Sequence, residues 1–528
     1  LTSIVLLHGS MDTDVRKMDH NRDGFRDLPK ADQLNIANKW LYTADNGMQI
    51  RWGWKFVQEN RLGGMYGYKN NAAMREAMLH DWRNWETQEG EKPLYGSHLR
   101  NRNANGYLKI GMPVGAAVYD EDEADELRSN IAFVADFDHY NEDAYFGLND
   151  YAGNENSVSV NLMYNHYFTY RSSLIVGVQG HLQYFRERLD NRTPWITADP
   201  QRYNLDRDER EAGAYAEYTY TIKDKFSLVA GIRGDYNHYY DRFFATPRGH
   251  LRWNITPTTT LRASAGLGYR STNLITDNIG VLATGRRIGF LTATGTESFT
   301  DRDFAGLDRM EKALTVGGSL TQTFKLVRED AATLSFDWFR TQFYHAVVTD
   351  QEYDPTAILF YGSDGRSYTD TYQIDFSWTP IERFDIFATF RYTDSEMTIA
   401  RPDGTVAHVE RPLVSKYKTL LNLQYATKFR RWVFDATAQL NGPMRVPSQT
   451  GELAGSYQSP RYPIFFAQVT RKIGKFDLYV GCENIGDYRQ KDPIQGWENP
   501  YSAAFNSMNV WGPLMGRKFY IGMRLNLY

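Results

Sequence analysis

The sequence predicts an all-β fold, a large transmembrane antiparallel β-barrel, and three observations lead to this prediction. Apolar and polar residues alternate along many segments, as they do in a strand with one apolar and one polar face. Short connections alternate with long ones along the chain. Aromatic residues make up 15% of the 528 residues, with 36 Tyr among them, and outer-membrane barrels carry aromatic girdles at both membrane interfaces.

The alternation supports each predicted strand in turn. In the closing segment the residues Phe519, Ile521, Met523, Leu525 and Leu527 share one parity, and mostly polar or small residues share the other. Comparable runs lie at 1–6, 33–43, 48–59, 104–111, 129–139, 156–168, 173–186, 211–222, 226–239, 247–256, 259–268, 312–326, 331–345, 372–379, 384–394, 415–427, 432–440, 461–473 and 476–483. Roughly 20 strands are therefore expected, which is within the range of large outer-membrane barrels.

The connections predict an up-and-down barrel with tight turns on the periplasmic side and long loops outside. Short connections lie at 44–47, 169–172, 223–225, 256–259, 327–330, 380–383, 428–430 and 474–475. Long connections lie at 60–103, 187–210, 269–306, 345–366, 395–414, 442–460 and 485–515. One connection, 112–128, is longer than its periplasmic position predicts. Without internal repeats or linkers, residues 1–528 are expected to form one barrel domain.

The composition excludes several classes of protein. The mean hydropathy of −0.56 is compatible with a barrel, because only alternate residues face lipid, and no apolar run approaches the ~18 residues of a transmembrane helix. A net charge of −4 provides no basic field for nucleic acid. The single Cys482 excludes an internal disulfide and lies on the lipid-facing parity of its strand. The sequence begins in mid-strand without an initiator Met, so a longer secreted precursor is expected.

Short motifs spread along the chain resemble the TonB-dependent outer-membrane receptors of the Bacteroidetes type. One of them is Gly268-Tyr269-Arg270-Ser271-Thr272-Asn273, and another is Glu483-Asn484-Ile485-Gly486-Asp487-Tyr488. The others lie at 18–29, 277–283, 311–313, 365–368, 492–494 and 511–513. No single motif is diagnostic, but their order and their positions at strand ends match the family rather than any one substrate.

The resemblance implies a 22-stranded barrel around an N-terminal plug, energised by the TonB complex in the periplasm. It implies import of a scarce large ligand such as a corrinoid, a ferric siderophore or haem, no enzymatic activity, and room for a surface-exposed lipoprotein partner. This sequence is expected to be the barrel portion in the bacterial outer membrane, without the plug, the energiser-binding segment and the first two strands of the family.

A calcium site is predicted in the connection between the first two predicted strands, 1–6 and 33–43, which the alternation of connections places outside the cell. Asp19, Asn21, Asp23 and Asp27 offer side-chain oxygens at alternate positions, and Phe25 offers a backbone carbonyl after the turn-forming Gly24. This spacing follows the first nine positions of a calcium-binding loop, but Lys30 stands where a bidentate Glu is expected, so weak binding is predicted. The alternative is a solvated polar turn.

Candidate ligand-binding residues are the aromatic residues of loop 60–103 and two residues of the 268–273 motif. Aromatic rings suit a bulky and partly apolar ligand. The residues are Tyr66, Tyr68, Trp82, Trp85, Arg270 and Asn273.

Two other functions remain open from the sequence. They are an outer-membrane barrel hydrolase with an active site at the rim, and a structural or adhesive barrel. No nucleophile elbow or metalloprotease spacing occurs, so no catalytic residue is predicted.

Overall fold

The structure, a computed structural model, describes residues 1–13, 18–82, 92–120, 123–193, 201–292, 295–299, 307–327, 330–448 and 456–527. Its main sheet has 25 strands. Five of them (β8, Gln201–Asn204; β13, Arg287–Leu291; β14, Glu297–Ser298; β17, Ala357–Ser363; β20, Val406–Glu410) are short segments at one end, which leaves 20 strands in the wall. This number agrees with the sequence prediction.

The wall strands pair antiparallel in chain order once the short segments are set aside. They are β1 (Thr2–Met11), β2 (Lys30–Thr43), β3 (Gln49–Gly64), β4 (Gly96–Asp120), β5 (Glu123–Phe146), β6 (Asn149–Thr169), β7 (Ser172–Asn191), β9 (Arg207–Ile222), β10 (Phe226–Asn237), β11 (Arg242–Thr256), β12 (Thr259–Ser271), β15 (Met310–Val327), β16 (Asp330–Asp350), β18 (Ser367–Ile381), β19 (Phe384–Ala400), β21 (Tyr417–Ala426), β22 (Trp432–Asn441), β25 (Tyr462–Ile473), β26 (Phe476–Glu483) and β27 (Lys518–Leu525).

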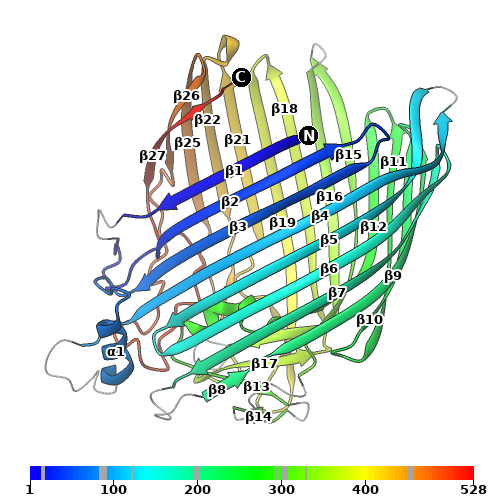
Figure 1. Ribbon diagram of the computed structural model, residues 1–528. Helices are drawn as coiled ribbons and strands as arrows, with labels where there is room; N and C mark the ends of the chain where they lie inside the picture. The colour runs from blue at the N-terminus through cyan, green and yellow to red at the C-terminus, as the bar shows by residue number, and fades with distance from the viewer. Residues whose placement is uncertain are drawn as a thin grey trace.

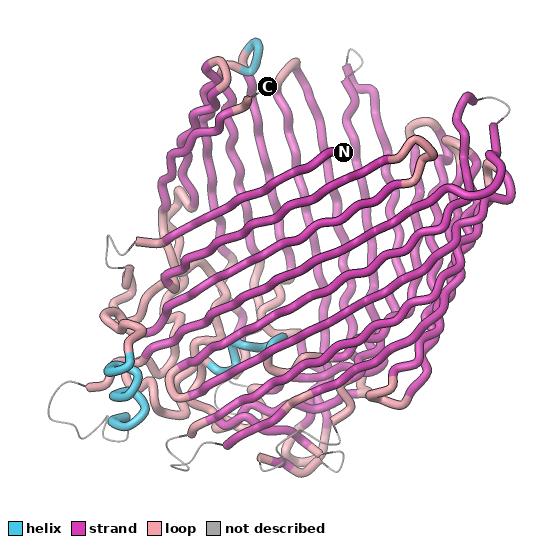
Figure 2. The backbone as a smooth tube through the Cα atoms, viewed as in Figure 1, coloured by secondary structure: helices cyan, strands magenta, loops and turns pink. Residues whose placement is uncertain are grey.

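The ends of the wall differ as the connection lengths predict. In Figure 1 the short turns lie at the upper end, and the long loops lie at the lower end with α1 (Ala72–Asp81) and the short strands. The 3₁₀ helix η2 (Thr276–Leu282) lies at this loop end behind the front strands, whereas η3 (Lys428–Arg430) forms one of the upper turns (Figure 2). A separate pair, β23 (Arg445–Val446) and β24 (Tyr457–Gln458), completes the secondary structure. None of the helices in the described ranges is long and apolar enough to span a membrane.

The strands are longer than a membrane crossing requires. β4 has 25 residues and β5 has 24, whereas about 9–11 residues cross the hydrocarbon core. The connection 112–128, expected to be a long link, is therefore mostly strand, because β4 continues to Asp120 and β5 starts at Glu123, with a register shift between Pro113 and Ala117. At the loop end, two connections are also short: residues 147–148 join β5 to β6, and residues 238–241 join β10 to β11.

The two faces of the wall follow the predicted parities. On β22, Trp432 and Phe434 are 41% and 43% exposed on the outer face. On the inner face of β18 and β19, the Gln373 amide and the Thr389 hydroxyl donate to Asp375 at 2.8 and 2.6 Å. Polar side chains thus satisfy one another in a wet lumen while apolar ones face lipid.

The wall has one seam. β1 pairs only with β2, and β27 pairs only with β26, among the described residues. All ten residues of β1 are exposed. The ladder is therefore open between its first and last strands.

The parity of β22 predicts that an introduced charge destabilises the barrel much more on the outer face than on the inner face. Ala436→Arg places a guanidinium on the lipid face and should cost about 2–4 kcal/mol of folding free energy near the bilayer midplane. Thr437→Arg points into the lumen and should cost only about 1 kcal/mol, since it removes the hydrogen bond that Asn422 donates to Thr437. Urea unfolding in lipid vesicles measures both. Equal losses would show that the parity assignment is wrong.

Candidate functional site

The described parts of the long loops pack into a layer at the lower end of the barrel (Figure 1). An aromatic group, here called the mouth cluster, is buried between four connections. It consists of Phe25, Tyr68, Met78, Trp82, Tyr95, Leu148, Tyr501 and Phe505. Its rings lie in ordinary aromatic contact, with centroids of Tyr95 and Phe505 4.9 Å apart and those of Phe25 and Phe505 5.7 Å apart.

Local sequence determines how α1 joins the mouth cluster. The Asn71 side chain accepts a hydrogen bond from the Met74 amide at 2.9 Å and so caps the helix. Met78 on the inner face of α1 is fully buried. Arg75 fastens the helix to the wall by donating to the Gly147 carbonyl and to Asp150, both at 2.5 Å.

The loop between β26 and β27 reaches across the mouth. The Tyr501 hydroxyl donates to the Pro93 carbonyl at 3.2 Å, more than 400 residues away in the chain. The next residues contact the connection between η2 and β13, where the Gly285 amide donates to the Phe505 carbonyl at 3.1 Å and Asn506 pairs with Thr284. Three loops that are far apart in sequence thus form one layer.

The predicted calcium loop packs beneath the mouth cluster. Gly24 has a φ of +84°, and it provides the turn expected of it. Asp23 is buried and accepts hydrogen bonds from the Phe25 amide at 2.8 Å and from the Asn21 side chain at 2.6 Å. Asp27 is paired with His20.

Burial raises the pKa of the Asp23 carboxyl above its ordinary value, and the nearby carboxylates of Asp19 and Asp27 raise it further. The loop therefore gathers three acidic groups, but its protein donors already satisfy part of them. No group of three or more His, Cys, Asp or Glu side chains in the described part of the chain is arranged to hold a metal ion. Calcium binding by Asp19, Asn21, Asp23, Phe25 and Asp27 stays a prediction.

A cavity of about 850 Å³, here called the mouth cavity, opens on the inner wall beneath the loop layer. Arg248 of β11, Arg270 of β12 and Arg411 of loop 401–416 line it, together with Asp277 and Glu311. Arg270 donates to Asp277 at 2.6 Å and lies 3.5 Å from Glu311. The cavity is thus lined by both signs of charge, with basic groups in excess.

Arg411 is the basic group of the mouth cavity that comes from a loop rather than the wall. Its guanidinium carbon lies 5.3 Å from the centre of the Phe343 ring, within the distance of a cation–π contact. Burial lowers the pKa of Arg411, and Glu311 opposes this shift. A partly dehydrated guanidinium is suited to bind an anionic group strongly, because its cost of losing water is already met.

The start of η2 is held against the wall by a buried acid. Glu187 of β7 is 1% exposed. Its carboxylate accepts a hydrogen bond from the Tyr151 hydroxyl at 2.9 Å, and that hydroxyl lies 2.7 Å from the Thr276 hydroxyl at the start of η2. The attachment of η2 therefore depends on this carboxylate.

The structure separates the predicted ligand-binding residues into two groups. Tyr68 and Trp82 are buried in the mouth cluster, where the Tyr68 hydroxyl lies 2.9 Å from that of Tyr145. Tyr66 contacts the predicted calcium loop, since the guanidinium carbon of Arg26 lies 5.1 Å from the centre of its ring. Trp85 lies outside the described residues.

Arg270 and Asn273 form the second group, the former on β12 and the latter two residues beyond its last residue, Ser271. Arg270 lines the cavity, and Asn273 accepts a hydrogen bond from Arg207 at 2.7 Å. Arg248 and Arg411 were not predicted from the sequence as ligand-binding residues. The inward position of Arg248 could have been predicted, because it follows from the alternation of apolar and polar residues along β11. The position of Arg411 over β15 and β16 could not, because nothing in the local sequence indicates it.

Comparison with known proteins gives two findings. Residues 17–485 match the family model described as TonB dependent receptor-like, beta-barrel. No curated protein matches the sequence significantly.

The chain is also similar to solved receptor structures. One is the siderophore receptor PiuA from Acinetobacter baumannii (TM-score 0.63, 13% identity, 99% of this chain and 77% of that chain). Others are the siderophore receptor PirA from the same organism (0.61, 12%, 99% and 75%) and the ferric-catecholate import receptor Fiu from E. coli (0.62, 12%, 99% and 77%). At these identities the similarity shows the fold alone.

For the predicted calcium loop we expect weak calcium binding, with a dissociation constant of about 10⁻⁴–10⁻³ M. Calorimetry on the purified protein should detect it at pH 7.5, and the affinity should fall as the pH is lowered, because protons compete for Asp23. Asp23→Ala should abolish binding. Asp403→Ala is the control, since Asp403 makes a similar turn bond to the Thr405 amide at 2.9 Å. If the wild type, Asp23→Ala and Asp403→Ala bind calcium equally, the loop is a polar turn and not a calcium site.

Proposed function

The chain belongs to the TonB-dependent receptor β-barrel family of the bacterial outer membrane, and from this premise we propose that it imports a scarce large ligand such as a corrinoid, a ferric siderophore or haem. Members of this family are receptors and transporters that work with TonB, not enzymes. Two of the structurally similar proteins are siderophore receptors by name and the third is a ferric-catecholate import receptor, and this supports a metal-complex ligand without identifying it.

The observation that carries the proposal is the mouth cavity. It lies between an ordered loop layer and the lumen, where a ligand captured outside must enter. Its volume of about 850 Å³ suits a ligand of several hundred daltons or a large part of a bigger one. The wall arginines and the partly dehydrated Arg411 supply the specific polar contacts. Loops 60–103, 187–210, 269–306 and 485–515 are the segments assigned to capture.

The partners follow from the same proposal. An N-terminal plug would occupy the lumen against inward polar residues such as Asp375 and Asp435, and the TonB complex would act on it from the periplasm. A wide barrel of about 20 strands leaks unless it is plugged. A surface-exposed lipoprotein could cover the loop layer. Neither the rim hydrolase nor the adhesive barrel is favoured by a specific observation in the described ranges.

Uptake by intact cells tests the proposal. Cells with and without the receptor are given a labelled panel of ferric siderophores, cyanocobalamin and haem, with and without a protonophore. One panel member should accumulate only in energised cells that carry the receptor. If no member of a broad panel does so, import of this class of ligand is contradicted.

A variant pair then tests the cavity. Arg411→Gln should weaken surface capture of the imported ligand by about tenfold or more, because one charge-assisted hydrogen bond is lost. Arg461→Gln removes an exposed arginine at the same end of the barrel that lies outside the cavity. It should change capture by less than about twofold, as surface substitutions usually do. Equal effects of both variants would exclude a role for the mouth cavity.

A further inference from the structure

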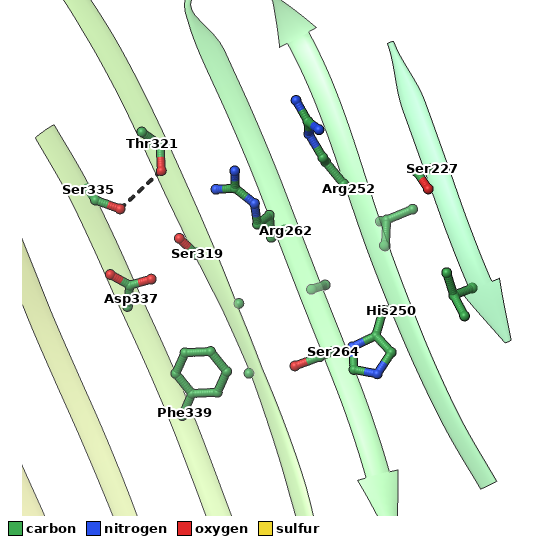
Figure 3. A pocket seen from close by; sticks show the side chains of 15 residues that line it. Ser227, His250, Arg252, Arg262, Ser264, Ser319, Thr321, Ser335, Asp337 and Phe339 are labelled. Carbon is green, nitrogen blue, oxygen red and sulfur yellow. Dashed lines mark hydrogen bonds between the residues drawn. The ribbon is translucent and has the colours of Figure 1, made fainter. Parts of the chain in front are cut away.

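A second hollow lies on the inner wall, closer to the short turns. It has a volume of about 530 Å³ and spans strands β10, β11, β12, β15 and β16. Figure 3 shows its lining side chains on adjacent strands. One row across the sheet is Arg252, Arg262, Ser319 and Asp337, since each of these residues stands directly opposite the next.

Small residues form the floor of this hollow. Ser264 and Ser319 contribute only hydroxymethyl groups, and Gly317 contributes none. A Cβ at Gly317 would lie 2.3 Å from the Phe339 ring, so the ring can lie over the backbone only because this residue is glycine. The hollow is therefore shaped by the sequence at one defined place in the wall.

Arg252 and Arg262 place two positive charges side by side above this floor. They are directly opposite in the β11–β12 ladder, where like charges destabilise a sheet. Both side chains extend in the same direction along the wall (Figure 3). No ion pair or hydrogen bond joins either guanidinium to another residue of the described ranges. Arg248, on the same face of β11, does have such a partner, because it donates to Glu217 at 2.7 Å.

The surroundings of the pair are mostly neutral. His250 lies on the next row of β11, and the hydroxyls of Ser264 and Ser319 face the same hollow. Asp337 is the one acidic group that lines the described part of this hollow, and the β15 strand separates it from Arg262. Among the described residues of the barrel, neither arginine thus forms an ion pair, and the nearest acidic group of the hollow, Asp337, lies one strand beyond Arg262.

We propose that Arg252 and Arg262 form an anion-binding site that holds a carboxylate or phosphate group of the imported ligand as it passes the short-turn half of the lumen. The inference rests on the proposed function and deepens it, since it assigns the ligand to the anionic class. Each guanidinium offers a planar fork of donors that matches the oxygens of such a group. Binding also removes the repulsion between the two arginines.

Calorimetry on the full chain in detergent tests the site at low salt. The probes are citrate for carboxylates and pyrophosphate for phosphates, with sucrose as the neutral control. The wild-type protein should bind at least one anion and not sucrose, and the affinity should fall as salt is added. Arg252→Gln and Arg262→Gln should each weaken binding by about tenfold or more, and Arg252→Lys should weaken it less than Arg252→Gln.

Two further variants make the test specific. Asp337→Asn removes the nearby negative charge and should strengthen binding, which a merely structural effect would not do. Arg51→Gln is the matched control, because Arg51 also faces a like charge, Lys109, near a short turn but lies outside the hollow. It should leave binding within about twofold. Resistance of the folded barrel to unfolding in SDS shows that every variant is folded.

The outcomes separate the site from the proposed function. Anion binding that depends on Arg252 and Arg262 supports the site even if no panel ligand is imported, in which case only the proposed function fails. Import of a panel ligand by a receptor that binds neither anion overturns the site. The site is also overturned if the arginine variants and Arg51→Gln bind the anions equally.

Discussion

The pairing of every backbone polar group within the membrane is the constraint on which the rest of this structure depends. An unpaired amide or carbonyl in hydrocarbon costs several kcal/mol, so strands can cross a bilayer only in a continuous ladder. The ladder here runs from β1 to β27 with each strand antiparallel to the next. It fixes the parity of every side chain, and this parity separates an apolar surface from a polar lumen. At the seam, the outer edges of β1 and β27 are not paired with another strand of the described residues.

The same ladder continues beyond the membrane and organises the loop layer. At the loop end, β16 extends to pair with β17 and β19 extends to pair with β20, and buried polar contacts then lock the loops together. Glu352 and Arg445 form an ion pair at 2.7 Å that is almost fully buried, and the Ser448 amide donates to the same carboxylate at 2.8 Å. Removing one partner of such a pair leaves an uncompensated buried charge. The loop layer is therefore a folded unit rather than a fringe of independent loops.

Much of the wall could be predicted from sequence, because strand parity and turn length are local properties. The two faces of β22 and the outward face of β27 were predicted residue by residue. Contacts between loops could not be predicted, because they join distant segments. Examples are the parallel pairing of Arg287 with Ala357 and the hydrogen bond from Tyr501 to Pro93.

In the candidate sites, too, local features could be predicted from the sequence and contacts between distant segments could not. The inward parity of Arg252 and Arg262 follows from alternation, and the short turn between their strands makes them neighbours. The burial of Tyr68 and Trp82 does not follow, since a loop aromatic residue has the same local sequence whether it binds a ligand or packs in a core. Asp23 is similar, because an aspartate with this spacing suits both a calcium loop and a hydrogen-bonded turn.

The sidedness of the barrel tests the central claim most directly, namely that the loop layer and the short turns lie on opposite sides of the outer membrane. Single cysteines replace Phe429, which is 84% exposed in a short turn, and Trp497, which is 37% exposed in the loop layer, in a chain whose Cys482 is changed to Ala. An impermeant thiol reagent applied to intact cells should label the cysteine at Trp497 and not the one at Phe429, and lysis should make both reactive. Labelling at Phe429 alone in intact cells would contradict the account.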